Sequence, residues 1–309
     1  MNQTKKKLLI TGATGYIGSW LVRFFSDNNY HIIAHGSSEQ TISQLKQKLQ
    51  QQHYSLDAID FWQQNFMEEW WTFPNFQELE YIIHCAALTS VRKGVYENYN
   101  AYFDVNVEGT KRIAKKALEL GITHFIHLSS GQIYGNPEIF PIDDHTLKEP
   151  INLYGFTKLM SEEVIKSLGT FGLNHTIIRP FSVYGKEQSN IISIILNKIK
   201  SEEPLTIFGD GTQKRAFMHI DDICNAIHLV LGNEVCFGEE YNLSGPKEYS
   251  VNLLVKMISK KFQKEPHIIY KGSRVNELQR NLADTSKLKR LGFHYTHSLE
   301  NFIDLLPTF

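Results

Sequence analysis

A glycine-rich segment directly after a short apolar run constrains the fold more than any other feature of this 309-residue chain. Residues 7–11 read KLLIT, a length and composition typical of a buried parallel strand. Residues 11–18 follow as TGATGYIG, and apolar side chains then recur at helical spacing as far as Asn28. A second apolar run covers residues 30–34. Strand, glycine turn, helix and strand together form a βαβ unit, whose turn is suited to hold a phosphate.

The three glycines of this segment have different physical tasks. Gly12 lets the chain turn tightly off the strand, Gly15 lets a phosphate approach the backbone, and Gly18 permits close packing of the following helix. The helix that begins near Gly15 points its free amide groups and the positive end of its dipole at the bound group. Directly after a strand and before a helix, this triplet predicts a dinucleotide site rather than a plain structural turn.

Beyond the first βαβ unit, apolar runs of strand length alternate with segments of helix length. We expect strands at 58–61, 81–85, 124–128 and 175–178, and helices at 40–52, 98–120 and 153–168. Alternation of this kind predicts an α/β fold with a Rossmann-type, doubly wound parallel sheet.

After Pro180 the alternation becomes irregular, which indicates a second and smaller α/β unit. Helical spacing returns at 191–200 and 251–262. We therefore expect a dinucleotide-binding Rossmann domain over residues 1–178 and a substrate-binding lobe over residues 179–309. Some chain of this lobe is expected to return to the main sheet.

Composition and charge limit the classes of partner. The formal net charge of −1 gives no global attraction to nucleic acid or to an anionic membrane. The three cysteines, Cys85, Cys224 and Cys236, are widely spaced and predict neither a disulfide framework nor a metal site, which fits a reducing cytosol. No apolar stretch reaches the length of a membrane span. We expect a soluble cytoplasmic protein that binds no metal, nucleic acid or membrane.

A tyrosine and a lysine four residues apart predict acid–base chemistry. Tyr154 and Lys158 share one face of the helix expected at 153–168. A free phenol has a pKa of about 10, and a nearby ammonium group together with the positive ring of a bound nicotinamide favours the phenolate and lowers that value. Tyr154 is then able to take a proton from an alcohol as hydride leaves carbon. Ser130 follows the strand at 124–128, where a doubly wound sheet holds its ligands, and is placed to hydrogen-bond the same oxygen.

The end of the second strand bears on the choice of dinucleotide. An acidic residue there usually holds the ribose diol of NAD. Here the strand is followed by His35, Ser37 and Ser38, and the first carboxylate is that of Glu39. The imidazole and hydroxyls are able to receive a 2′-phosphate, although no arginine stands beside them, so the sequence favours NADP over NAD. The alternative is that His35 and Ser37 merely begin a loop and Glu39 reaches back.

Short motifs along nearly the whole chain resemble those of one protein family. They are TGATGYIG at 11–18, HCAA at 84–87, NVEGT at 106–110, SSGQIYG at 129–135, YGFTK at 154–158, RPFSVYG at 179–185 and GDGTQKRAFMHIDD at 209–222. With these motifs in this order, the chain resembles the extended short-chain dehydrogenase/reductases. Within them it is similar to the NAD-dependent epimerase/dehydratase family, which acts on nucleotide sugars.

The resemblance implies roles for individual residues. It implies that Ser130, Tyr154 and Lys158 are the catalytic triad and that Arg215 and Arg274 grip a diphosphate through their planar guanidinium groups. The implied cofactor contacts are Gly12, Thr14, Gly15, Tyr16, Ile17, Gly18, His35, Ser37, Ser38, Asn65, Ala86, Ala87, Asn106, Tyr154 and Lys158. The implied substrate contacts are Thr89, Ser90, Ser130, Gln132, Ser182, Arg215 and Arg274. A homodimer formed through the helices near 98–120 and 153–168 is implied as well.

Departures from the family pattern limit the reaction. The 4,6-dehydratases carry an Asp-Glu pair where this chain has Gly131 and Gln132, and elimination of water needs an acid and a base there. The sequence therefore predicts no 4,6-dehydratase activity. Ser182 stands where many members have Asn, and Ala216 where many have Asp, so the sugar and the base stay open.

Two reactions at C4 of a nucleotide-linked hexose or deoxyhexose fit these residues. One is 4-epimerisation with retained cofactor, and the other is reduction of a 4-keto sugar with NADPH. An alternative is a short-chain reductase of an aldehyde or ketone without a nucleotide, which Arg215 and Arg274 disfavour. A protein that binds a dinucleotide without turnover is a further alternative, and the complete set of Ser130, Tyr154 and Lys158 disfavours it.

Overall fold

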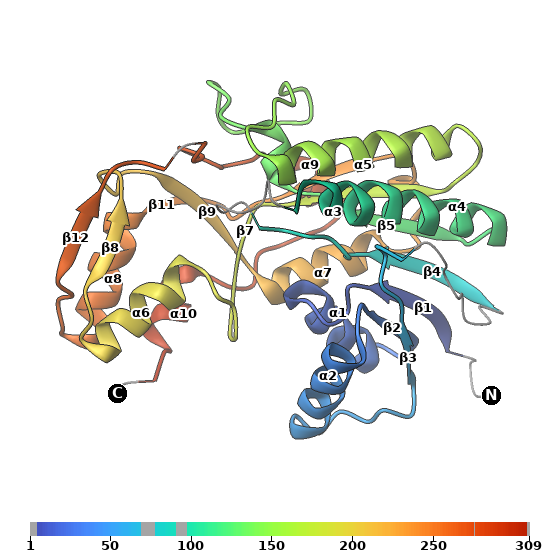
Figure 1. Ribbon diagram of the computed structural model, residues 1–309, viewed down its shortest axis with the longest axis horizontal. Helices are drawn as coiled ribbons and strands as arrows, with labels where there is room; N and C mark the ends of the chain where they lie inside the picture. The colour runs from blue at the N-terminus through green and yellow to red at the C-terminus, as the bar shows by residue number, and fades with distance from the viewer. Residues whose placement is uncertain (1–4, 69–77, 91–97, 275, 308–309) are drawn as a thin grey trace.

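A seven-stranded parallel sheet organises the molecule (Figure 1). The computed structural model describes residues 5–68, 78–90, 98–274 and 276–307. Every neighbouring pair of strands in the sheet is parallel. In spatial order the strands are β10 (Glu240–Leu243), β6 (His175–Pro180), β5 (His124–Leu128), β4 (Leu79–His84), β1 (Lys6–Thr11), β2 (Tyr30–Gly36) and β3 (Ile59–Gln63). The Rossmann-type sheet expected from the sequence is confirmed.

Helices cover both faces of this sheet, because alternate side chains of each buried strand point to opposite sides. Leu8 and Ile10 of β1 pack into one apolar core, whereas Leu9 packs into the other. The first core contains residues of α1 (Tyr16–Asp27), α2 (Glu39–Gln51), α7 (Ile220–Val230) and α9 (Ser286–Arg290). The second contains residues of α4 (Thr110–Leu120) and α5 (Leu153–Gly169).

A smaller unit lies beside the main sheet, at the left of Figure 1, and has an apolar core of its own. A parallel pair joins β8 (Leu205–Phe208) and β12 (Ile268–Lys271), and a three-stranded sheet joins β11 (Glu248–Ser250), β9 (Lys214–His219) and β7 (Ser182–Tyr184). Its helices are α6 (Ile191–Ser201), α8 (Val251–Phe262) and α10 (Leu299–Asp304). Since β10 pairs with β6, chain from beyond residue 179 also belongs to the main sheet. A domain boundary near residue 178 stays a prediction.

The helix expected over 98–120 differs from a single continuous α-helix. It consists of α3 (Tyr99–Phe103), a π-helical segment (Asp104–Gly109) and α4, which ends at Gly121 in the left-handed conformation. The wider turn directs the buried Asn106 side chain at Leu88, where it accepts from the backbone N–H at 2.8 Å and donates to the carbonyl at 3.0 Å. Such π-helical turns often mark functional sites. Across the described residues, no helix is both long and apolar enough to span a bilayer.

Candidate active site

A cavity of about 780 Å³ opens at the carboxyl ends of the main strands. Its walls come from the segments after β1, β2, β3, β4, β5 and β6 and from the start of α5, the place where doubly wound sheets hold ligands. Most residues that the sequence assigned to a cofactor line it together. They are Gly12, Thr14, Gly15, Tyr16, Ile17, Gly18, His35, Ser37, Ser38, Asn65, Ala86, Ala87 and Tyr154.

The glycine loop closes tightly at the amino end of α1. Gly12 adopts a φ of +66°, and a β-carbon there would lie 2.7 Å from the backbone nitrogen of Ala86. The N–H of Gly15 donates to the carbonyl of Gly12 at 2.9 Å, which folds the loop back on itself. Because Gly15 precedes α1, the free amide groups of the first turn face the cavity, as a pyrophosphate site requires.

His35 fixes this loop from the second strand. Its Nδ1 accepts from the N–H of Gly12 at 3.1 Å, so its Nε2 carries the hydrogen and donates to the carbonyl of Gln64 at 2.8 Å. Burial lowers the pKa of His35 to about 4, so the ring is neutral at pH 7. Ser38 has a structural task of its own, since its Oγ caps α2 by accepting from the N–H of Thr41 at 3.3 Å.

The predicted catalytic residues come from β5 and α5. Asn152 caps α5 by accepting from the N–H of Gly155 at 2.8 Å, which places Tyr154 in the first turn and Lys158 one turn later. Tyr154 and Ser130 both line the cavity, and Ser130 is close enough to affect the pKa of the Tyr154 phenol. Lys158 is only 1% exposed and lies behind the cavity wall.

Two opposing effects act on the pKa of Tyr154. Burial raises the pKa of Tyr154 to about 12, and Ser130 acts in the opposite direction. The expected lowering by Lys158 together with the positive ring of a bound nicotinamide stays a prediction. The Lys158 Nζ lies 3.3 Å from Nε2 of His127 on β5.

Asn106 also lies behind the wall and not on it. Its side-chain amide donates to Thr157 Oγ1 at 2.9 Å in addition to its two bonds with Leu88. It thereby ties the segment after β4 to α5. The neighbouring His84 is held at both nitrogens, by Thr11 at 2.7 Å and by Thr110 at 2.9 Å. These bonds leave the strand ends around the cavity rigidly connected.

The predicted substrate residues fall into two groups. Thr89, Ser130 and Gln132 line the cavity, whereas Ser90, Ser182, Arg215 and Arg274 stand outside its lining. Ser182 Oγ accepts from the side chain of Asn281 at 2.8 Å. Burial lowers the pKa of Arg215 on β9, and its Nη1 donates to the carbonyl of Lys214 at 2.8 Å. The guanidinium of Arg274 lies over the ring of Phe208, 3.9 Å from its centroid.

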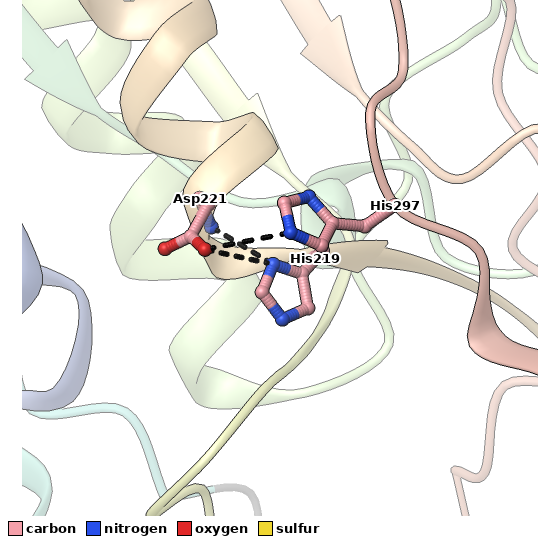
Figure 2. A group of neighbouring side chains, drawn as sticks. All are labelled: His219, Asp221 and His297. Atoms are coloured by element: carbon pink, nitrogen blue, oxygen red, sulfur yellow. Dashed lines mark hydrogen bonds and ion pairs between the residues drawn. The ribbon is translucent and has the colours of Figure 1, made fainter. Parts of the chain in front are cut away.

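A separate polar cluster stands where β9 meets α7 (Figure 2). The rings of His219 and His297 stack with centroids 4.0 Å apart and planes 16° apart, and Asp221 Oδ2 lies 3.6 Å from a nitrogen of each. His219 Nδ1 also accepts from the N–H of Asp221 at 3.2 Å. A metal site needs lone pairs that converge on one point, and nearly parallel rings direct theirs in separate planes. The cluster therefore caps α7 and anchors the segment before α10.

A family model describes this combination of fold and loop. The model of the NAD dependent epimerase/dehydratase family matches residues 8–244. The chain belongs to the NAD dependent epimerase/dehydratase family. The matched region contains the glycine loop, Ser130, Tyr154 and Lys158, and it ends at the last strand of the main sheet.

Relatives within the family are similar over nearly their full length. A putative UDP-glucose 4-epimerase of Methanocaldococcus jannaschii is 31% identical over 295 residues, covering 93% of this chain and 92% of that protein. A UDP-glucuronate 4-epimerase of Thermodesulfobacterium geofontis is 28% identical, with coverage of 92% and 89%. The solved structure of a UDP-glucuronic acid 4-epimerase of Bacillus cereus, with UDP-glucuronic acid and NAD, matches with a TM-score of 0.85 at 26% identity over 96% of each chain.

Several residues that line the cavity were not predicted from the sequence. They are Gln64, Phe66, Met67, Cys85, Leu88, Val105, Leu128, Ser129, Pro180, Phe181, Val183 and Gln188. Most of them stand at or just beyond the carboxyl end of a main strand, and that position is a signal that could have found them. Gln188 lies beyond the end of β7, in a stretch that no pattern marks.

Proposed function

We propose that this chain is a nicotinamide-dependent 4-epimerase of a nucleotide sugar. One observation carries the proposal: Tyr154 and Ser130 share a single cavity with a complete pyrophosphate-binding glycine loop. A cavity of about 780 Å³ lies within the usual size range of ligand and cofactor sites. The names of the relatives and the solved complex with UDP-glucuronic acid and NAD support C4 as the reacting carbon.

In this mechanism the chain moves one proton and positions one carbon. The nicotinamide supplies the hydride acceptor, and later the hydride donor. Tyr154 takes the proton of the C4 hydroxyl as the C4 hydride leaves, which forms a 4-ketone. Ser130 lines the same cavity as Tyr154 and would hydrogen-bond the C4 oxygen during the reaction. After the ketone turns its other face, Tyr154 returns the proton as hydride returns to C4. A bound nicotinamide would add a positive charge beside Tyr154, and that charge together with the ammonium of Lys158 would favour the phenolate against the effect of burial.

Epimerisation and ketoreduction differ in whether the cofactor is consumed. We favour epimerisation, because two relatives similar over the whole chain carry the name of 4-epimerases. A 4,6-dehydratase is disfavoured by the residues after Ser130. Gly131 has no side chain, and Gln132 bonds through its Oε1 to the side chain of Asn152 at 2.9 Å. Neither residue supplies the acid and the base that elimination needs.

We infer that NAD is preferred over NADP, although the sequence favoured NADP. A 2′-phosphate requires cations or free donors. His35 is neutral with both nitrogens bonded. Ser38 Oγ lies 3.2 Å from Thr41 Oγ1, whose own hydrogen goes to the carbonyl of Ser38, so the Ser38 hydroxyl donates to Thr41. Glu39 in the first turn of α2 adds a negative charge that would repel the phosphate. A carboxylate at this place suits the ribose diol of NAD.

A second copy of the chain is the proposed partner of α4 and α5. Tyr99, Leu120 and Phe156 are 46%, 41% and 45% exposed on neighbouring elements, and α3, α4 and α5 lie along one side of the molecule (Figure 1). Exposed apolar side chains of this size are typical of an interface. Light scattering of the purified protein tests this, and a monomer at working concentration would contradict it.

The function is tested by incubating the purified protein with UDP-glucose, UDP-galactose and UDP-glucuronic acid, with NAD added. Interconversion of C4 epimers by proton NMR, without net change in absorbance of reduced nicotinamide, is the expected result. Stoichiometric consumption of NADPH with a 4-keto sugar would instead indicate the reductase. Reduction of simple aldehydes with no turnover of any nucleotide sugar would overturn the proposal.

A further inference from the structure

The ammonium of Lys158 contacts an imidazole inside the protein. Lys158 Nζ lies 3.3 Å from Nε2 of His127, and both side chains are buried. His127 belongs to β5, three residues before Ser130, and Lys158 lies on the α5 face that covers this strand. An ammonium only donates, so the contact is favourable only when Nε2 presents a lone pair. The tautomer of His127 and the charge of Lys158 are therefore linked.

Ser161 forms the second half of this linkage. Its Oγ donates its single hydrogen to the carbonyl of Lys158 at 2.7 Å, and it lies 2.9 Å from Nε2 of His127. Ser161 Oγ can accept from a hydrogen on Nε2 while it donates to that carbonyl, or its hydroxyl can turn and donate to Nε2 when Nε2 presents a lone pair. A hydrogen on Nε2 finds its acceptor in Ser161 but then also faces Nζ, which is tolerable only when the lysine is neutral. A lone pair on Nε2 accepts from the charged lysine.

The environment of Nδ1 makes the two tautomers of His127 differ in free energy. Nδ1 is buried, and no group among the described residues hydrogen-bonds to it. When Nε2 accepts from Lys158, the ring hydrogen sits on Nδ1 and is an unsatisfied buried donor, which costs free energy. The charge-assisted bond from Lys158 offsets that cost. When Lys158 is neutral, no charge-assisted bond offsets it, and the hydrogen is more stable on Nε2.

Four other titratable residues face the Lys158–His127 pair, and each is held by its own hydrogen bonds or by burial. They are His84, Cys85, Glu162 and His175. His84 stacks on His127 with centroids 5.5 Å apart and has both nitrogens bonded. Arg179 holds the Glu162 carboxylate with bonds of 2.9 and 2.8 Å, burial raises the pKa of Cys85 to about 12, and His175 Nδ1 lies 3.0 Å from the carbonyl of Leu173.

We propose that His127 is a positioning residue for Lys158: its Nε2 lone pair keeps the buried ammonium charged, and the ring changes tautomer when the lysine loses its proton. In that change Nε2 gains the hydrogen that Nζ gives up, Nδ1 loses its own, and one proton leaves the pair. Burial lowers the pKa of Lys158 to about 8, which puts the change near neutral pH. The catalytic consequence rests on the proposed function, but the tautomer change does not.

Nitrogen NMR of protein labelled with 15N-histidine tests the tautomer change directly. Titration from about pH 6 to about pH 10 spans the lysine transition. We expect His127 to pass from the Nδ1–H to the Nε2–H form without becoming charged, and loss of its signals in His127→Gln assigns them. His84, with both nitrogens bonded, keeps one tautomer and is the internal control. Lys158→Met must abolish the change. A single His127 tautomer over this range, or a change that survives Lys158→Met, overturns the proposal.

A pair of variants tests the positioning role. His127→Leu removes the acceptor, whereas His127→Gln keeps an acceptor oxygen. We expect the alkaline limb of kcat/KM to move down by about one to two pH units in His127→Leu, the size of a charge-assisted hydrogen bond, and to stay in place in His127→Gln. An unchanged limb in His127→Leu overturns the role. Should His127→Leu not fold, the NMR titration decides. If no nucleotide sugar turns over, the pH dependence of NAD binding is measured in place of kcat/KM. The role of His127 can then be tested even if the proposed function is wrong.

Discussion

The carbonyl oxygen of Gly12 lies 2.2 Å from the point where a β-carbon on Gly18 would stand. The same β-carbon would lie 2.8 Å from Cα of Ala13. Both neighbours are backbone atoms of the loop, so no side-chain rotation relieves the clash. The first turn of α1 can approach the loop this closely only because residue 18 is a glycine. That approach brings the helix amide groups to the cavity.

Gly18→Ala is therefore expected to push α1 away from the loop. We expect NAD affinity to fall at least tenfold and the free energy of unfolding to drop by about 1–3 kcal/mol, the usual cost of overpacking. Calorimetric titration and urea unfolding measure the two effects. Gly272→Ala is the matched control, since a β-carbon there meets no atom within 4 Å. Equal NAD affinity in both variants would contradict the assignment of the loop.

Tyr154→Phe removes the proton carrier and keeps the ring. Because Tyr154 lines the cavity and is the proposed acid and base, we expect kcat to fall by roughly 10²- to 10⁴-fold. NAD affinity should change little, since the glycine loop is untouched. Turnover by coupled assay and NAD binding by calorimetry test this. Glu163→Gln, which changes an exposed side chain on the same helix, is the control and should keep wild-type turnover. Wild-type turnover in Tyr154→Phe would remove Tyr154 from the mechanism.

The carboxylate of Glu240, on the edge strand β10, makes the stability of the protein depend on pH in the acid range. Its carboxylate contacts Arg179, lies 2.6 Å from Nζ of Lys166 and lies 3.5 Å from Nζ of Lys148. Although burial acts in the opposite direction, Arg179 and Lys166 lower the pKa of Glu240 to about 2. The ordinary pKa of a glutamate carboxyl is 4.5. A carboxyl whose pKa is lower in the folded state stabilises the protein at pH values above 4.5, and this contribution is lost as the pH falls toward 2.

We therefore expect Glu240→Gln to cost about 1–2 kcal/mol at neutral pH, after allowance for solvent screening. The difference from the wild type should narrow as the pH falls below about 4.5. Urea unfolding over a series of pH values measures it. Glu163→Gln, which removes an exposed partner of the same Lys166, should have an effect within about 0.5 kcal/mol at every pH. A constant difference at all pH values would refute the electrostatic account.

The sequence predicted most of the sheet and the loop, because both depend on local patterns. Apolar runs and glycine spacing marked β1, α1 and β2 within two residues of their observed limits. The proposed catalytic residues could be located because Ser130 closely follows strand β5 and Tyr154 lies in the first turn of helix α5. The π-helical turn around Asn106 had no such mark, since it depends on bonds to Leu88 and Thr157 from other parts of the chain.

The pKa values of the site residues could not be predicted from residue spacing in the sequence. The Tyr154–Lys158 interval gives proximity but not burial, and burial decides the direction of the Tyr154 pKa. The neutral state of His35 likewise depends on burial, which lowers the pKa of the ring although the hydrogen bond to the carbonyl of Gln64 acts in the opposite direction. Both are consequences of tertiary packing, and the preference for NADP was drawn from residues whose partners the sequence does not reveal.

Gly131 lies against the ring of Phe181, and this contact bears on the absence of a dehydratase pair. A β-carbon at position 131 would lie 2.8 Å from ring carbons of Phe181. Gly131→Ala should therefore cost about 1–3 kcal/mol by overpacking, and much less in a Phe181→Ala background. A double-mutant cycle by thermal unfolding measures this coupling. Additive effects would show that the two positions do not interact.

Because of this contact, we predict that placing the Asp-Glu pair of the 4,6-dehydratases at positions 131 and 132 does not produce dehydratase activity. In a Gly131→Asp, Gln132→Glu variant the carboxylate at 131 displaces the Phe181 ring and, with it, the cavity wall. We expect no 4-keto-6-deoxy product from a nucleotide hexose, together with a loss of 4-epimerase activity. Gln132→Glu alone keeps an acceptor for Asn152, so it should fold normally and serve as the control. Formation of the 4-keto-6-deoxy product by the double variant, detected by mass spectrometry, would mean that the wall adapts and that Phe181 does not limit the reaction.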